Sequence, residues 1–195
     1  MILKRVQVTT PQVGLKTNSY IVCDERTKEA MVIDPGGEPG KIAEVLDILG
    51  AQLKYIFITH CHADHIGGIA ELKKLKGGKI LISRTDAEGL FNEEINLAYL
   101  INMEKPELEA DSRVDDEDLI HVGDIEFKVI ATPGHTKGGL CLYSEKEGFQ
   151  ENETRMGLLK AVSPEVFSVT VSKCVALQLK KFVEEKLTIP DVIFE

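Results

Sequence analysis

The sequence predicts an α/β protein with layers of helices and sheets, folded as one domain over residues 1–195. Short apolar runs typical of strands alternate with turn signals, other segments repeat apolar residues at helical spacing, and the two kinds of segment are mixed along the chain. A chain of 195 residues can bury one sizeable core, and a prior of about 150 residues per domain argues against two. We therefore expect a single mixed α/β domain.

The expected strands are short runs bounded by turn residues. DPGGEPG at 34–40 ends one such run, because proline and glycine supply turn dihedrals that strand residues avoid. Gly123 opens a Gly-Asp pair that resembles a hairpin turn. The runs that predict strands are 3–8, 19–24, 29–34, 55–59, 79–83, 119–122, 125–132 and 139–143.

Helices are predicted where apolar residues recur every three or four positions. Glycines at 50, 77 and 78 are placed to end two of them. A third follows TDAE at 85–88, which matches a capping box. The expected helices carry apolar positions 42–49, 66–75 and 90–101, and a polar, acidic loop is expected at 104–118.

The histidines are concentrated in THCHADHIGG, where His60, His62 and His65 account for three of the 5 in the chain. Alternate side chains of an extended segment point the same way, so His60 and His62 can converge on one ion. Asp64 and His65 come as the chain turns into a helix and can reach a second, adjacent position. Three histidines beside an aspartate have little structural purpose without an ion, so the segment predicts metal binding.

A further histidine, His135, lies in TPGHTKGG, between a proline-glycine turn and two glycines. Ligands are common on such fixed loops at strand ends, so we expect His135 to complete the set begun by His60 and His62. His121 lies inside a strand run without acidic or histidine neighbours at ligand spacing, and we expect it to be structural. Strand alternation turns Cys61 away from its neighbours, which favours a buried structural thiol.

Charge and cysteine usage limit the partners and the location. The net charge of −9 would repel phosphate backbones and anionic lipids, so we expect a small-molecule substrate, no nucleic acid and no membrane. The N-terminal residues lack a signal-peptide pattern, and the 4 cysteines lack C-x-x-C spacing. A cytoplasmic location with reduced thiols is the simplest expectation.

The motifs THCHADHIGG, TPGHTKGG and DPGG together resemble the metallo-β-lactamase superfamily, and most closely its short members related to glyoxalase II, the hydroxyacylglutathione hydrolases. The resemblance covers residues 1–148 and leaves 149–195 as a divergent tail. It implies an αββα sandwich with a metal centre at one edge of the two sheets, usually zinc and sometimes iron or manganese. It also implies hydrolysis of thioester or related ester substrates through a metal-bound hydroxide.

Position by position, the resemblance assigns His60, His62 and His135 to the first metal site. It assigns Asp64 and His65 to a second site. Three imidazoles and one open position suit a zinc ion that activates water, so we expect one ion there. Asp64 then becomes a catalytic candidate, as a general base for the metal water.

Two ligands of the family pattern have no counterpart, namely an aspartate that bridges both metals and a last histidine. No histidine follows His135, and the only aspartate after residue 143 is Asp191, in an unrelated setting. We therefore expect a weakened second metal site and impaired activity. Two alternatives stay open: a catalytically inactive metal-binding or interaction module, and an iron-dependent sulfur dioxygenase of the same fold.

The tail carries a further expectation. A deletion, frameshift or truncation would leave the second half of the sandwich incomplete and the strand at 139–143 as an uncovered edge. Such an edge favours homodimerisation. Alternatively, a strand at 165–171 pairs there and a helix at 173–187 covers the sheet.

Overall fold

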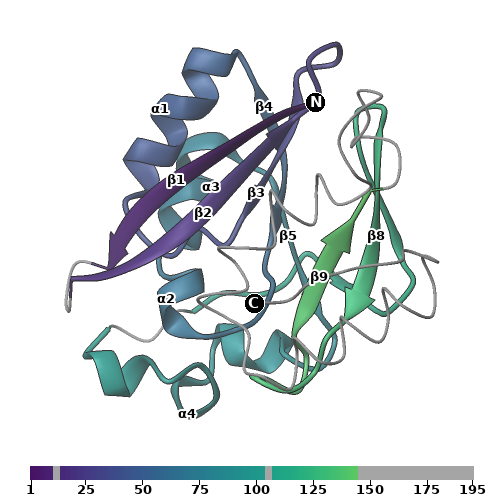
Figure 1. The fold of residues 1–195 in the computed structure, drawn as a ribbon. Coiled ribbons are helices and arrows are strands. Elements are labelled where there is room, and N and C mark those ends of the chain that lie inside the picture. The colour runs from purple at the N-terminus through teal and green to yellow at the C-terminus, as the bar shows by residue number, and fades with distance from the viewer. Residues whose placement is uncertain (11–13, 104–106, 145–195) are drawn as a thin grey trace, which may run out of the picture.

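Two β-sheets pack face to face, with helices on the outer side of the first (Figure 1). The structure is a computed structural model that describes residues 1–10, 14–103 and 107–144. Its first sheet has the strand order β1-β2-β3-β4-β5-β6, and its second has the order β7-β8-β9. The strands are β1 (Ile2–Thr10), β2 (Leu15–Cys23), β3 (Glu29–Ile33), β4 (Gln52–Phe57), β5 (Lys79–Ser83), β6 (Ser112–Val114), β7 (Leu119–Val122), β8 (Ile125–Ala131) and β9 (Leu140–Tyr143).

The first sheet changes from antiparallel to parallel pairing at β3. Strands β1, β2 and β3 pair antiparallel, whereas β3, β4, β5 and β6 pair parallel. Parallel neighbours need a crossover, and helices α1 (Pro39–Leu49) and α3 (Ile69–Lys76) supply the first two. These crossovers bring the segments after β3 and β4 to the same end of the sheet.

Both faces of the first sheet are buried, each in its own core. One face packs on α1 and α3 through residues such as Ile42, Leu46 and Leu72. The other packs on the second sheet, where Phe57 and Phe127 belong to one apolar cluster. Burial on both sides explains why the central strands are continuous apolar runs rather than alternating ones.

The predicted α/β fold is confirmed, with a helix layer, a sheet and a second sheet among the described residues. Helix α1 begins at Pro39, a residue suited to a first helical turn. Gly50 follows its last residue with a φ of 61°, which suits a glycine, so the predicted terminating glycine is confirmed. The expectations for the strand at 165–171, the helix at 173–187 and the incomplete second half all lie outside the described residues.

The helix predicted over 66–75 is divided into two. Helix α2 (Ala63–Ile66) ends at Gly67, and α3 starts after Gly68. The amide of Gly68 donates to the Pro35 carbonyl at 2.7 Å, and a Cβ at Gly68 would lie 2.6 Å from that oxygen. The break therefore comes from close packing against the turn after β3, which apolar spacing does not reveal.

A single helix over 90–101 is also wrong. The segment forms the 3-10 helices η1 (Ala87–Leu90) and η2 (Ala98–Ile101), with α4 (Glu93–Asn96) between them. The Asn96 side chain donates to the Gly89 carbonyl and accepts from the Ala98 amide, which competes with helical hydrogen bonding. In its described part, residues 107–118, the expected loop contains one short strand, β6.

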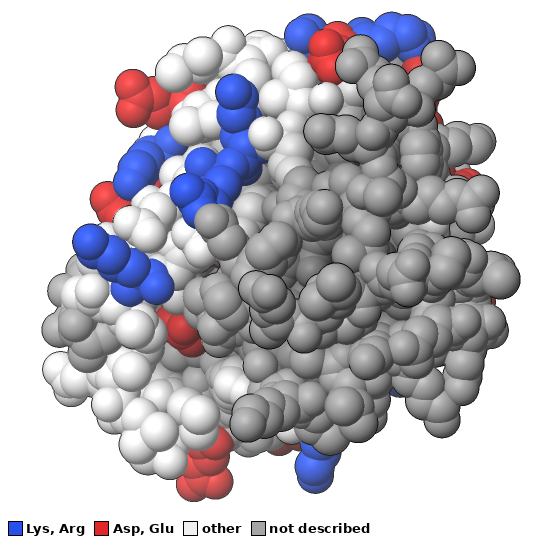
Figure 2. Space-filling view, viewed as in Figure 1, with Lys and Arg blue, Asp and Glu red and all other residues white. Residues whose placement is uncertain are grey.

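The surface carries mixed charges on the face that includes β1 and β2. Lysine and arginine side chains lie there with acidic side chains beside several of them (Figure 2). Among the described residues, no helix has the length and apolar character needed to cross a bilayer.

Candidate metal centre

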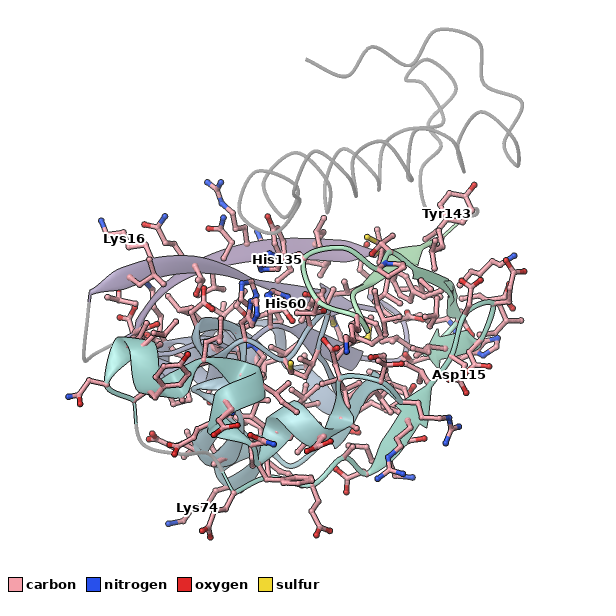
Figure 3. The ribbon with its side chains drawn as sticks, turned by 90° about the horizontal axis from the view of Figure 1, so that it is seen from below. Lys16, His60, Lys74, Asp115, His135 and Tyr143 are labelled. Atoms are coloured by element: carbon pink, nitrogen blue, oxygen red, sulfur yellow. The ribbon has the colours of Figure 1, made fainter. Side chains whose placement is uncertain are left out.

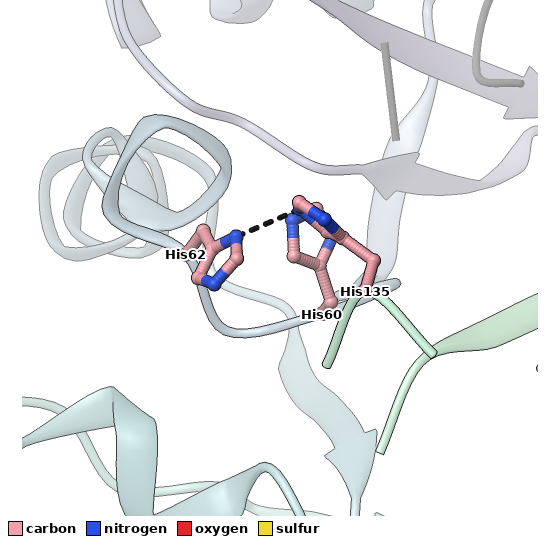
Figure 4. Close-up of side chains that lie close together, drawn as sticks. All are labelled: His60, His62 and His135. Carbon is pink, nitrogen blue, oxygen red and sulfur yellow. Dashed lines mark hydrogen bonds between the residues drawn. The ribbon is translucent and has the colours of Figure 1, made fainter. Parts of the chain in front are cut away.

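Three imidazoles from two distant segments meet at one end of the first sheet (Figures 3 and 4). His60 and His62 lie between β4 and α2, and His135 lies in the loop between β8 and β9. Their ring centroids are 4.8 Å apart for His60 and His62, 4.9 Å for His60 and His135, and 4.5 Å for His62 and His135. The structure thus brings together the three histidines expected at the first site.

The backbone that carries these side chains differs from the predicted extended strand. Strand β4 ends at Phe57, so His60 and His62 lie beyond the sheet, and His62 is the residue before α2. His60 is buried, His62 is partly exposed and His135 is exposed. The cluster therefore runs from the protein interior to its surface, so an ion could reach it from solvent.

A chain of hydrogen bonds orients the His60 ring. The Thr59 hydroxyl donates to Asp34 Oδ2 at 2.6 Å, so its oxygen is left to accept from His60 Nδ1 at 3.1 Å. The proton of neutral His60 is therefore placed on Nδ1, and Nε2 keeps its lone pair. This Nε2 is buried and has no hydrogen-bond partner.

Asp34 organises the site from the turn after β3. Its Oδ1 accepts from the Thr59 amide at 2.8 Å, and its Oδ2 also lies 3.0 Å from His65 Nδ1. Asp34, His60 and His65 are near enough to hold an ion, but the Asp34 oxygens already have these donors. We therefore interpret Asp34 as an orienting residue rather than a ligand.

The electrostatics keep the three convergent imidazoles neutral. Burial lowers the pKa of His60 well below its usual value, and the neighbouring histidines lower it further. Burial also lowers the pKa of His62 and of His135. Neutral imidazole is the form that binds a metal, so these shifts favour ligation at neutral pH.

His65 has the opposite shift. Burial disfavours its charged form, but the charge and hydrogen bond of Asp34, together with the charge of Asp64, outweigh burial and raise its pKa. Its Nε2 lies 3.5 Å from Asp64 Oδ2, and the Asp64 side chain is partly exposed. Asp64 and His65, the residues predicted to begin a second site, lie next to each other, and the His65 ring centroid is 4.2 Å from that of His60.

The donor set fits a divalent metal ion. One ligand nitrogen from each of His60, His62 and His135 lies within 4.8 Å of the other two, and His62 Nδ1 is 2.9 Å from His135 Nε2. Nitrogens bound tetrahedrally to zinc at about 2.0–2.1 Å are roughly 3.3 Å apart, so small ring movements suffice. The buried, unpartnered Nε2 of His60 is costly without a ligand, and an ion would satisfy it.

The remaining sequence expectations concern single residues. His121 is exposed on β7, where its Nε2 lies 3.1 Å from Glu126 Oε2, away from the cluster. Cys61 is buried, and burial together with the nearby Asp86 carboxylate raises its thiol pKa to about 12. Asp34 and Thr59 were not among the predicted site residues, because DPGG indicates a turn and not the hydrogen bonds that Asp34 makes to Thr59 and His65.

The fold and the three imidazoles define a metal-binding protein with two facing sheets. The profile of the metallo-beta-lactamase superfamily matches residues 13–149. The chain therefore belongs to the metallo-beta-lactamase superfamily, whose members bind metal ions, commonly zinc.

Curated relatives come from several bacteria. An uncharacterized protein of Aquifex aeolicus (strain VF5) is 39% identical over 135 residues, which cover 68% of this chain and 62% of that protein. A probable polyketide biosynthesis zinc-dependent hydrolase of Bacillus subtilis (strain 168) is 30% identical over 71% of this chain and 56% of its own. A hydroxyacylglutathione hydrolase of Pelagibacter ubique (strain HTCC1062) is 33% identical over 66% of this chain and 46% of its own. The matches thus span less than two thirds of each of these relatives.

Solved structures support the same fold. The BLEG-1 B3 metallo-beta-lactamase superposes with a TM-score of 0.67 at 23% identity over 86% of both chains. The subclass B3 metallo-beta-lactamase MEM-A1, from a soil metagenome library, gives a TM-score of 0.58 at 26% identity over 78% of this chain and 56% of its own.

Proposed function

We propose that this chain is a metal-dependent hydrolase of thioester or related ester substrates, with one zinc ion held by His60, His62 and His135. The observation that carries the proposal is the convergence of these three neutral imidazoles, one with a buried nitrogen that lacks a partner. The substrate class follows the relatives named hydroxyacylglutathione hydrolases. We also propose that residues 1–195 form one domain that acts in the cytoplasm.

A zinc ion at this position would supply Lewis acidity, which polarises a carbonyl and activates water. Asp64 is proposed as the general base, because its partly exposed carboxylate lies beside the cluster. Its Oδ2 faces His65, so Oδ1 is the oxygen that would accept the proton. His65 orients that carboxylate through Nε2, while Asp34 holds the other nitrogen of the His65 ring. The exposed side of His135 is where a small substrate would enter.

A second candidate is a metal-binding module without catalysis. It is favoured by the sequence after residue 143, which contains neither the bridging aspartate nor the last histidine of the family pattern. Asp64 and His65 alone would hold a second ion weakly, because two protein ligands leave most of its coordination to water. An iron-dependent sulfur dioxygenase is a third candidate, and iron in the purified chain would favour it over the hydrolase.

One preparation distinguishes these candidates. The full chain is purified, its metals are counted, and hydrolysis of a hydroxyacylglutathione thioester is followed. We expect zinc-dependent turnover that is lost in His135→Ala and kept in His121→Ala, the control at an exposed histidine outside the cluster. Bound zinc without turnover above the His135→Ala background would reject the hydrolase and support the inactive module.

The proposed homodimer would form through the edge of the second sheet. Strand β9 pairs with β8, and none of the described strands pairs with its other edge. Sedimentation equilibrium of the full chain tests this, and a monomer at all concentrations would reject it.

A further inference from the structure

We propose that Asp86 is a positioning residue for the metal centre, because its buried carboxylate joins the segment that carries His60 and His62 to the loop that carries His135. Asp86 itself touches none of the three imidazole nitrogens that would bind an ion, so its effect would be indirect. The inference rests on the proposed function, since a positioning role requires the ion.

The geometry consists of two hydrogen bonds from two separate segments. Asp86 is 3% exposed, its Oδ2 accepts from the Cys61 amide at 3.2 Å, and its Oδ1 accepts from the Gly138 amide at 2.8 Å. Cys61 stands between two expected ligands, and Gly138 follows His135 by three positions. One carboxylate therefore fixes the backbone close to all three histidines.

Asp86 is itself held on the first sheet. Its amide donates to the Ser83 hydroxyl at 3.0 Å, at the end of β5, and its carbonyl accepts from the Gly89 amide at 2.9 Å. Strand β5 is paired on both sides, by β4 and β6. The carboxylate thus has a rigid support, which a positioning group needs.

Two glycines, Gly138 and Gly89, allow the backbone near the histidines and the segment that carries Asp86 to pack closely together. A Cβ at Gly138 would lie 2.5 Å from Asp86 Oδ1 and 2.2 Å from the Ser83 hydroxyl oxygen. A Cβ at Gly89 would lie 2.5 Å from Cys61 Sγ. A side chain at either position would push the two segments away from Asp86.

The loop that carries His135 is closed by its own hydrogen bonds. The Thr132 amide donates to the Gly139 carbonyl at 2.7 Å, and the Gly134 amide donates to the Thr136 carbonyl at 2.9 Å. Because the loop is closed, a shift of Gly138 would move His135 with it. A second hydrogen bond joins the two segments, from the Leu140 amide to the Thr59 carbonyl at 2.8 Å. It lies at the start of β9 and not in the loop that carries His135.

Asp24 provides a matched control at the other end of the molecule. Its buried carboxylate also joins two turns through backbone amides, accepting from Arg26 at 2.8 Å and from Asp124 at 2.6 Å. Asp24 lies beside the start of β3, whereas the metal centre lies beyond the end of β4, which runs parallel to β3. Its removal should affect stability without affecting the metal centre.

The experiment measures zinc affinity by competition with a chromophoric chelator, the absorption spectrum of the cobalt-substituted chain, and unfolding in urea. We expect Asp86→Ala to lower zinc affinity about tenfold or more and to change the cobalt spectrum. Asp86→Asn keeps one acceptor oxygen and should fall between Asp86→Ala and the wild type. Asp24→Ala should lose stability yet keep wild-type zinc affinity and spectrum.

Two results would overturn the positioning role alone: wild-type zinc affinity in Asp86→Ala, or an equal loss of affinity in Asp24→Ala. A wild-type chain that binds no zinc would overturn the proposed function, and this inference with it. The failure of the inference is thus distinguishable from the failure of the function.

Discussion

Replacing Thr59 by valine tests the orientation of His60 with a change of nearly equal volume. The Thr59 hydroxyl is the only bridge described between Asp34 and the His60 ring, with bonds of 2.6 and 3.1 Å. Without it, the buried His60 Nδ1–H loses its acceptor, which costs about 1–3 kcal/mol. With the bond to the carboxylate also lost, we expect the free energy of unfolding to fall by roughly 2–4 kcal/mol.

The same change should weaken metal binding, because His60 is then free to move its proton to Nε2 or to rotate. Loss of the partner that orients a ligating histidine typically lowers metal affinity about 10- to 100-fold. Urea unfolding and zinc competition measure the two effects on one sample. Thr59→Ser keeps the hydroxyl and should keep most of the affinity, so equal losses in the valine and serine variants, or wild-type zinc affinity in Thr59→Val, would refute the reasoning.

Three further predictions concern packing and pH. Gly36→Ala should destabilise the chain severely, because the new Cβ would lie 1.7 Å from the Asp64 carbonyl oxygen. Gly40→Ala lies in α1 with open space around it and should stabilise the chain by about 1 kcal/mol. Thermal unfolding compares the two variants with the wild type. Burial raises the pKa of Asp111, but hydrogen bonds from the Ile80 amide and Lys73 outweigh burial, so the pKa is lowered in the folded chain. The ionised Asp111 carboxylate therefore stabilises the fold fully above its unfolded pKa of about 3.9. This contribution is lost as pH falls through the lower folded pKa. The difference in unfolding free energy between wild type and Asp111→Asn should therefore be constant at neutral pH and shrink below about pH 4; a difference that shrinks at pH 6 would contradict this assignment. Because the pKa values of the three convergent imidazoles are lowered, zinc should stay bound during dialysis at pH 6.5 and leave only at lower pH, and release between pH 7 and 6.5 would argue against neutral ligands.

The parts of the fold that the sequence predicts well are those governed by local patterns. The central strands are apolar enough to be recognised without their partners, and the helix that ends at Gly50 has both its apolar face and its terminating glycine. Strand β6 was missed because Ser112–Val114 is only 3 residues long and mostly polar, so its place depends on pairing with β5.

The errors arise where distant segments compete with local preferences. TDAE at 85–88 predicts a capping box with Thr85 as the cap, but in the structure Asp86 takes the cap position of η1. Its carboxylate does not cap that helix and accepts from the amides of Cys61 and Gly138 instead. The break at Gly68 likewise depends on contact with Pro35. Such contacts exist only after the chain has folded, so no local pattern predicts them.

The candidate site likewise contains residues that the sequence predicts and residues that it does not. Ligand types at short spacing singled out His60 and His62, and a turn-rich loop singled out His135, and the structure brings the three rings together. The residues that orient them were missed, since Asp34 and Asp86 act through hydrogen bonds across 25 or more positions. An isolated aspartate in a turn does not indicate what it will bind.

The most direct test of the account is the zinc content of the full chain, measured by mass spectrometry of the metal in the wild type and in two histidine variants. We expect one zinc ion per wild-type chain, one in His121→Ala and none in His135→Ala after dialysis against a weak chelator. Two ions in the wild type would contradict the single site, and a full complement of zinc in His135→Ala would show that the three imidazoles do not bind the ion together.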